Sequence, residues 1–226
     1  MNPYPVPNAT VDVALFSLTG GGLGLLLPRR EREPFRGVRA LPGGYVHVEE
    51  DEDTHDTARR VAREKLGVDV SYLEQLYTFS GRARDPRGWS LSVTYLGLVP
   101  ATELSAAVRA DLVPVERLPA LPFDHGGIAA MAVRRLRDKS AYSSLPAFLL
   151  PETFTLHDLR TLYEQITGER IDKANFRRQI VDAQKLVEPT GAKRTGLAHR
   201  PAELFRLSEP VLKDFGKVVI PAGERR

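Results

Sequence analysis

The sequence predicts an α+β protein of two domains, the first with mixed strands and helices and the second with two helices and a short hairpin. Three observations support this fold class. The chain has 226 residues, more than one typical domain needs. Apolar runs typical of strands are interspersed with apolar residues at helical spacing. The net charge also differs between two parts of the chain. Residues 1–140 hold 18 basic and 18 acidic side chains, so the formal net charge of +3 comes from residues 141–226.

The composition excludes several classes of protein. Hydrophobic residues make up 42% of the chain and charged residues 27%, which is typical of globular and not of disordered or fibrous proteins. The absence of cysteine excludes disulfide scaffolds, thiolate zinc sites and thiol catalysis. The five histidines lack the spacing of a metal site, and we expect His125 only to cap or pack at a helix start. No signal peptide or membrane-spanning run is visible, so we expect a cytoplasmic protein without a membrane partner.

The first part of the chain predicts several strands and two helices. Two apolar runs, residues 11–16 and 23–27, are separated by three glycines and predict a strand hairpin. A helix is expected over residues 54–66, because its apolar residues recur at helical intervals, acidic residues precede it and Gly67 can end it. Two further strands and a connecting helix are expected over residues 68–79, 91–99 and about 127–140. Such a mixture indicates an α+β domain.

Two more helices are expected in the last third of the chain. Thr155 can cap the first, over about residues 156–167, and Asp158 can complete a capping box. Gly168 can end this helix. The second helix is expected over about residues 172–184. Its apolar side chains that should pack inward are Phe176, Ile180 and Ala183.

A hairpin is expected after these helices, because residues 186–189 and 203–207 are short extended segments on either side of a glycine-rich, basic loop. Helix, tight turn, helix and a hairpin with a basic tip form the layout of a winged helix-turn-helix domain. Between Arg170 and Arg200 stand eight basic and three acidic side chains, an excess that suits a polyanionic partner. We place the domain boundary so that the domains are residues 1–142 and 143–226.

The second helix and the basic loop carry the side chains expected to contact double-stranded DNA. Arginine pairs with guanine edges, asparagine pairs with adenine, and lysine suits phosphates. Asn175 and Arg178 share the face opposite the apolar one, and the loop would contact the backbone or a minor groove. A solvated helix beside a flexible basic loop is the alternative interpretation. The predicted DNA-binding residues are Lys173, Asn175, Arg177, Arg178, Lys193, Arg194, Thr195 and Arg200.

Residues 41–68 resemble the signature of the Nudix family. That signature runs Gly, five residues, Glu, seven residues, Arg-Glu-apolar-x-Glu-Glu-x-Gly-apolar. The positions that agree when the pattern is anchored on its second glycine are Glu52, Arg60, Glu64 and Gly67. Gly44 stands two residues too early for the first glycine, so the loop over residues 45–51 carries a two-residue insertion.

Two glutamates of the signature are replaced by Val61 and Lys65. These positions are four residues apart and therefore adjacent on a helix. In active Nudix enzymes both hold Mg²⁺, which requires oxygen ligands. Valine supplies none and lysine supplies a positive charge. We therefore expect no catalytic residues, no metal and no hydrolase activity, unless Glu49, Glu50 or Asp51 forms a site from the inserted loop.

A Nudix domain without these ligands, followed by a winged helix, resembles the Nudix-related transcriptional regulators of NAD metabolism, the NrtR family, over nearly the whole chain. Further matching segments are residues 85–88, 121–125, 150–156, 172–178 and 191–201. The resemblance implies a Nudix α/β/α sandwich with a mixed sheet. It also implies a homodimeric repressor of NAD biosynthesis or salvage genes that binds palindromic operator DNA.

The same resemblance implies that ADP-ribose acts as an effector, not a cofactor, in the former substrate pocket and releases the DNA. An arginine-rich loop precedes the Nudix signature and suits a diphosphate, while Phe79 and Trp89 suit either an adenine or core packing. The predicted effector-binding residues are Arg36, Arg39, Gly43, Gly44, Glu64, Arg82 and Arg87. Two alternatives stay open: an active ADP-ribose or sugar-nucleotide pyrophosphatase with an accessory domain, and a related regulator of sugar metabolism.

Overall fold

The structure is a computed structural model that describes residues 6–195 and 201–216. The chain divides into two compact units, residues 1–133 and 134–226, and each is described by itself. The division falls within helix α3 (His125–Ser140), which begins in the first unit and ends in the second. The domain boundary that we place after residue 142 stays a prediction. No helix within the two described ranges is long and apolar enough to cross a membrane.

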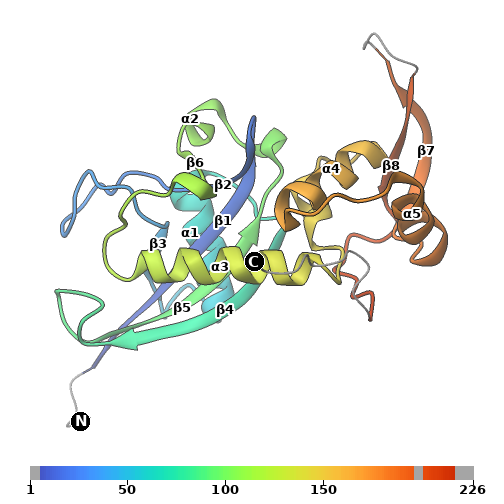
Figure 1. The fold of residues 1–226 in the computed structure, drawn as a ribbon. Helices are drawn as coiled ribbons and strands as arrows, with labels where there is room; N and C mark the ends of the chain where they lie inside the picture. The colour runs from blue at the N-terminus through green and yellow to red at the C-terminus, as the bar shows by residue number, and fades with distance from the viewer. Residues whose placement is uncertain (1–5, 196–200, 217–226) are drawn as a thin grey trace. The chain divides into compact units, whose positions relative to one another are not determined.

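The first unit is built on a mixed six-stranded sheet (Figure 1). Its strands are β1 (Asn8–Thr19), β2 (Gly22–Leu26), β3 (Gly43–Tyr45), β4 (Tyr72–Gly81), β5 (Ser90–Leu98) and β6 (Leu112–Pro114). Strand β1 pairs in parallel with β5 and antiparallel with β2 and β3, and the order along the sheet is β4-β5-β1-β2-β6. The four strands expected from apolar runs are confirmed, whereas β3 and β6 have only three residues each and gave no such signal.

Helix α1 (Thr54–Leu66) packs on one face of the sheet, and its bounds are those expected from the sequence. It begins because the Asp53 carboxylate accepts hydrogen bonds from two backbone N–H groups of the first turn. It ends because Gly67 adopts a left-handed conformation, with φ of 64°. Apolar residues of α1, including Ala58 and Ala62, form one core with alternate residues of β1, such as Val13.

The opposite face of β1 carries Asp12, and the start of α3 contacts the sheet there through His125. Figure 1 shows α1 behind the sheet and α3 in front of it. The two helices and the sheet form the expected α/β/α sandwich. The remaining short elements are η1 (Ala101–Glu103), α2 (Ala106–Arg109) and η2 (Val115–Arg117).

The second unit has the order of elements expected of a winged helix. The elements are η3 (Leu145–Leu149), α4 (Leu156–Thr167), α5 (Lys173–Arg177), η4 (Arg178–Ala183), β7 (Val187–Arg194) and β8 (Ala202–Leu207). Thr155 and Asp158 form the predicted capping box at the start of α4, and Gly168 ends the helix with φ of 78°. Strands β7 and β8 pair as a hairpin, and Phe205 of β8 exchanges backbone hydrogen bonds with Phe154, just before α4.

The second helix of this unit differs from the prediction in its later half. Helix α5 continues into η4, which is π-helical, so that the N–H of Gln184 donates to the carbonyl of Gln179, five residues earlier. Phe176 and Ile180 are buried, as predicted, but Ala183 is exposed. The predicted inward placement of Ala183 is wrong, because it depends on the angular spacing of an α-helix, whereas a π-helical turn contains more residues.

Candidate functional site

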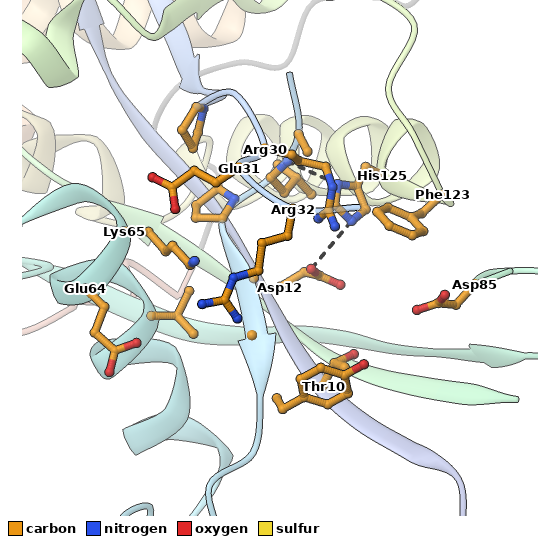
Figure 2. A pocket seen from close by; sticks show the side chains of 18 of the residues that line it. Thr10, Asp12, Arg30, Glu31, Arg32, Glu64, Lys65, Asp85, Phe123 and His125 are labelled. Carbon is orange, nitrogen blue, oxygen red and sulfur yellow. Dashed lines mark hydrogen bonds and ion pairs between the residues drawn. The ribbon is translucent and has the colours of Figure 1, made fainter. Parts of the chain in front are cut away.

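A cavity of about 440 Å³ lies in the first unit (Figure 2). Its lining comes from β1, β3, α1, the arginine-rich loop before β3, the loop between β4 and β5, and the segment that starts α3. Of the predicted effector-binding residues, those that line it are Gly43, Gly44, Glu64 and Arg87. Arg36, Arg39 and Arg82 do not line it.

Of the three arginines outside the cavity, two are exposed to solvent and one pairs with neighbouring strands. Arg36 and Arg82 are exposed. The guanidinium of Arg39 donates to the carbonyl of Leu27 at 2.7 Å and pairs with Asp111 at 3.0 Å, so this side chain fixes its own loop to the neighbouring strands. Arg29, in the arginine-rich loop expected to suit a diphosphate, does line the cavity. The further cations in the lining, for which the sequence predicts no such role, are Arg30, Arg32, Arg60, Lys65 and Arg84.

The aromatic residues at the cavity also differ from those expected. Phe79 and Trp89 do not line it, whereas Tyr45 and Phe123 do. The Arg30 guanidinium lies over the Phe123 ring, 4.8 Å from its centroid, in a cation–π contact. Tyr45 directly follows the glycines of the Nudix signature and Phe123 lies in the matching segment 121–125. Nothing in the sequence shows, however, that either side chain faces the cavity.

A buried network of charged groups surrounds Asp12 at the cavity. The Asp12 carboxylate accepts from the Ser92 hydroxyl at 2.7 Å and from Arg84 Nη2 at 3.2 Å, and it lies 3.5 Å from His125 Nε2 (Figure 2). Arg84 also donates to both oxygens of Asp124, at 3.0 and 3.1 Å. Burial raises the pKa of Asp12, but His125, Ser92 and Arg84 outweigh this effect and lower it to about 2. Asp12 is therefore a buried carboxylate anion.

Sequence reasoning missed Asp12 and Arg84 as site residues. Asp12 interrupts an apolar strand, and this lone charge among buried positions was the one available signal. His125 does pack at the start of α3, as expected, and its Nδ1 accepts a hydrogen bond from the Leu41 N–H at 3.1 Å.

The two glycines of the cavity allow β3 to approach its neighbours closely. A Cβ atom on Gly43 would lie 2.1 Å from Asp12 Oδ1 and 3.0 Å from the Val11 carbonyl oxygen. A Cβ on Gly44 would lie 3.0 Å from Val61 Cγ2, on α1. Residue 43 must therefore be glycine for the Asp12 network to form.

Arg60 holds the loop before α1. Its Nε and Nη2 donate to the two carboxylate oxygens of Asp51, each at 2.8 Å, and Nη2 also donates to the Tyr45 carbonyl at 2.9 Å. This bidentate pairing lowers the pKa of Asp51 far below its usual range. The partner of Arg60 in the loop is thus Asp51, whereas Glu52, which the signature aligns, is exposed.

The same contacts leave few ligands for a magnesium ion. Val61 is buried, with 1% of its surface exposed, and belongs to the core. Glu64 pairs with Arg60 at 3.2 Å, so its carboxylate already has a cationic partner. Lys65 contributes a positive charge to the cavity lining. These donors do not fit a Mg²⁺ site, which needs several free oxygens around the ion.

The inserted loop does not provide a substitute site. Neither Glu49, Glu50 nor Asp51 lines the cavity. Glu50 Oε2 lies 3.1 Å from His47 Nδ1, and Asp51 also accepts from the His47 N–H and the Thr57 hydroxyl. The alternative in which this loop rebuilds a metal site at the cavity is therefore not supported by the geometry.

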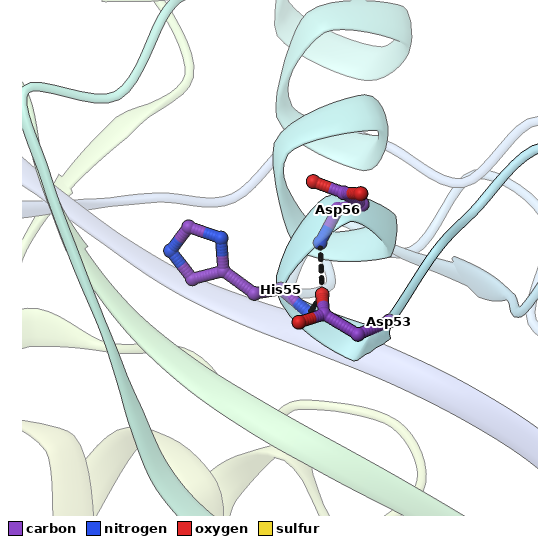
Figure 3. Close-up of side chains that lie close together, drawn as sticks. All are labelled: Asp53, His55 and Asp56. Atoms are coloured by element: carbon purple, nitrogen blue, oxygen red, sulfur yellow. Dashed lines mark hydrogen bonds between the residues drawn. The ribbon is translucent and has the colours of Figure 1, made fainter.

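One cluster of possible metal ligands occurs within the described ranges, at the start of α1 (Figure 3). Its ligand atoms, from Asp53, His55 and Asp56, lie within 4.8 Å of one another. Asp53 Oδ1 accepts from the backbone N–H groups of His55 and Asp56, at 2.7 and 2.9 Å. Helix capping accounts for this cluster, and none of the three residues lines the cavity.

The second unit displays most of the predicted DNA-binding side chains. The exposed ones are Lys173, Asn175, Arg177, Arg178, Lys193 and Thr195. Arg178 Nη2 donates to Asn175 Oδ1 at 2.8 Å, so these two side chains lie together where α5 continues into η4, and both are exposed. Arg200 lies outside the described residues.

Two predicted DNA-binding arginines contact other parts of the second unit. Arg194, on β7, pairs with Asp158 of the α4 capping box at 2.8 Å. The Arg177 guanidinium lies over the Phe205 ring of β8, 5.9 Å from its centroid. Both contacts connect the hairpin to a helix. A hollow of about 620 Å³ lies between the starts of α4 and α5 and strand β8, with Arg177 in its lining.

Both units match known families. The chain matches the Nudix domain over residues 7–133 and the NrtR DNA-binding winged helix domain over residues 146–207. The ADPR responsive transcriptional repressor NtrR of Acinetobacter baylyi is 37% identical over 218 residues, which cover 94% of this chain and 85% of that protein.

Two solved structures of NrtR from Shewanella oneidensis are also similar. The structure complexed with a 27mer DNA has a TM-score of 0.81 at 37% identity and covers 89% of this chain and 94% of that one. The structure of the NUDIX domain complexed with ADP ribose has a TM-score of 0.52 at 33% identity, covering 60% of this chain and 94% of that one. The chain therefore belongs to the NrtR family, which joins a Nudix domain to a C-terminal winged helix DNA-binding domain.

Proposed function

We propose that this protein is a transcriptional repressor that binds operator DNA through its winged helix domain and releases it when ADP-ribose binds in the Nudix cavity. The observation that carries the proposal is the match over both domains to an ADP-ribose-responsive repressor, at 37% identity across 94% of the chain. The NrtR structures solved with DNA and with ADP ribose support the two binding functions.

The second unit has the surface that DNA binding requires. Asn175 and Arg178 lie together and exposed where α5 continues into η4, and there they suit base edges. Lys193 on β7 suits the phosphate backbone. We propose that two copies of the chain bind a palindromic operator, because the symmetry of such a site matches a two-fold protein dimer. The regulated genes on this proposal are those of NAD synthesis or salvage.

The first unit has the cavity that a nucleotide effector requires. Its volume of about 440 Å³ falls within the range of ligand pockets, roughly 300–1,000 Å³. Arg30 provides charge for a diphosphate, and the faces of Tyr45 and Phe123 can contact a planar base. Release of DNA then requires that ADP-ribose bind more tightly to the DNA-free arrangement of the dimer.

The proposal includes the absence of efficient diphosphate hydrolysis. Val61 and Lys65 supply no metal ligands, and Glu64 is paired with Arg60. Without a positioned metal, the cavity lacks the means to activate water for attack on a phosphorus atom.

Gel-shift measurements test the proposal directly. The protein is mixed with DNA from upstream of neighbouring NAD genes, with and without ADP-ribose, and a scrambled DNA of equal length is the control. We expect the protein to form a shifted complex with the natural DNA, and we expect ADP-ribose to dissociate this complex. Failure to bind any palindrome from these regions would overturn the repressor function, and turnover of ADP-ribose with Mg²⁺ at enzyme-like rates would favour a pyrophosphatase.

A further inference from the structure

The cavity contains positively charged groups that are not neutralised by neighbouring carboxylates. Seven arginine or lysine residues and five carboxylates line it. Three of the carboxylates already pair with three of the cations, as Asp12 does with Arg84, Glu64 with Arg60, and Asp85 with Arg87 at 2.6 Å. The cations that remain are Arg29, Arg30, Arg32 and Lys65, and the remaining carboxylates are Glu31 and Glu33.

These four cations have no carboxylate within ion-pairing distance among residues 6–195 and 201–216. Arg30 is held by the Pro34 carbonyl and the Phe123 ring, and Arg29 donates to the Gly37 carbonyl. Burial and the positive charge of Arg87 lower the pKa of Arg30, as expected where like charges face one another. These four cations are therefore available to pair with an anionic ligand.

Lys65 holds a particular position among these cations. It is on the last turn of α1, at a position where the Nudix signature has a glutamate, and it lines the same cavity as Gly43 and Gly44. Figure 2 shows the Lys65 and Arg32 side chains extending toward the middle of the cavity. The neighbouring Glu64 carboxylate is paired with Arg60. An ammonium group thus stands where an active enzyme of this fold presents a metal ligand.

We propose that the Lys65 ammonium, with the unpaired arginines, binds the diphosphate of ADP-ribose in place of a divalent cation, so that the effector binds without Mg²⁺. This inference rests on the proposed function, because it concerns how the same cavity holds its effector. The physical reason is that each phosphate of the diphosphate carries a negative charge, and direct hydrogen bonds from ammonium and guanidinium groups can neutralise it.

Isothermal titration calorimetry of the full-length protein with ADP-ribose tests the inference. One titration contains EDTA and the other contains an excess of Mg²⁺, and we expect the same dissociation constant in both. Lys65→Gln should weaken ADP-ribose binding on the order of tenfold, the effect of losing one charge-assisted hydrogen bond. It should weaken AMP binding less, because AMP lacks the second phosphate.

Arg63→Gln is the matched control. Arg63 is on the same helix and loses the same charge when substituted, but it is exposed, pairs with Asp69 and does not line the cavity. We expect ADP-ribose affinity to be unchanged in this variant. Thermal unfolding of both variants should match that of the wild type, because each side chain is exposed.

A third variant distinguishes the role of the charge from that of the side chain. Lys65→Glu should abolish ADP-ribose binding in EDTA, and Mg²⁺ should restore part of it by bridging the new carboxylate to the diphosphate. A wild-type affinity that depends on Mg²⁺, or equal affinities for Lys65→Gln and Arg63→Gln, would overturn the inference while leaving the repressor function intact. If the wild type binds no ADP-ribose in either buffer, the proposed function itself fails.

Discussion

Asp12→Asn tests whether the buried charge network organises the cavity. The substitution keeps the size of the side chain and removes its negative charge from beside Arg84 and His125. The pKa of Asp12 is lowered from 3.8 to about 2, a shift that corresponds to about 2 kcal/mol of stability at neutral pH. We expect the variant to unfold more easily than the wild type by roughly this amount.

The stabilisation that Asp12 contributes depends on pH. Because the pKa of Asp12 is lower in the folded protein, its ionised form stabilises the fold fully above pH 3.8, the ordinary value, and this stabilisation is lost as the pH falls to about 2. The difference in free energy of unfolding between wild type and variant should therefore be about 2 kcal/mol at pH 7 and shrink toward zero near pH 2.

Urea denaturation followed by tryptophan fluorescence is the appropriate assay. Trp89 is the single tryptophan of the chain and lies in the first unit, so its signal reports the unit that contains Asp12. Asp69→Asn is the control, because this exposed carboxylate pairs with Arg63 at the surface and should contribute less than about 1 kcal/mol. A difference for Asp12→Asn that stays constant from pH 7 to pH 2, or that equals the control, would refute the reasoning.

Three further predictions concern the second unit. Phe176→Ala should lower the free energy of unfolding by about 3–5 kcal/mol in chemical denaturation. The reason is that the ring is buried and packs edge-on against Tyr163, with ring centroids 5.7 Å apart. A loss under about 1 kcal/mol would contradict its place in the core. DNA-binding titrations at several salt concentrations test the predicted DNA contacts. Arg178→Ala should reduce discrimination between operator and scrambled DNA, whereas Lys193→Ala should weaken binding to both DNAs about equally and lower the slope of log affinity against log salt by about 1. Equal salt slopes and unchanged discrimination would show that these residues are wrongly assigned as DNA contacts. Asp158→Asn should weaken the hydrogen bond that the Asp158 carboxylate accepts from the Thr155 N–H, and also the contact with Arg194, with a loss of about 1 kcal/mol measured by thermal unfolding. An unchanged melting temperature would show that these contacts stabilise neither the helix start nor the hairpin.

The sequence predicts the elements whose boundaries depend on near neighbours. Helix α1 begins and ends where expected because Asp53 and Gly67 act through backbone groups only a few residues away. The capping box of α4, between Thr155 and Asp158, is equally local. Such contacts are specified by short spacings, so a single sequence is enough to find them.

The cavity residues that were missed depend on contacts between distant parts of the chain. Asp12, Arg84 and Asp124 come from a strand and two separate loops, and no spacing in the sequence brings them together. The arginine-rich loop was recognised as a source of charge, but which arginines face the cavity depends on pairings such as that of Arg39 with Asp111. Side-chain direction in a loop is decided by these tertiary contacts and not by periodicity.

The substitutions on α1 also explain why binding and hydrolysis can be separated in this fold. A bound divalent metal neutralises a diphosphate, and it also orients and activates water for attack on it. The Lys65 ammonium has no open coordination position, so it neutralises the ligand without generating a nucleophile. Val61 fills the adjacent position with a buried methyl-bearing side chain and excludes a second ligand. On the proposed function this separation is required, because a receptor that hydrolysed ADP-ribose would destroy the signal that it reports.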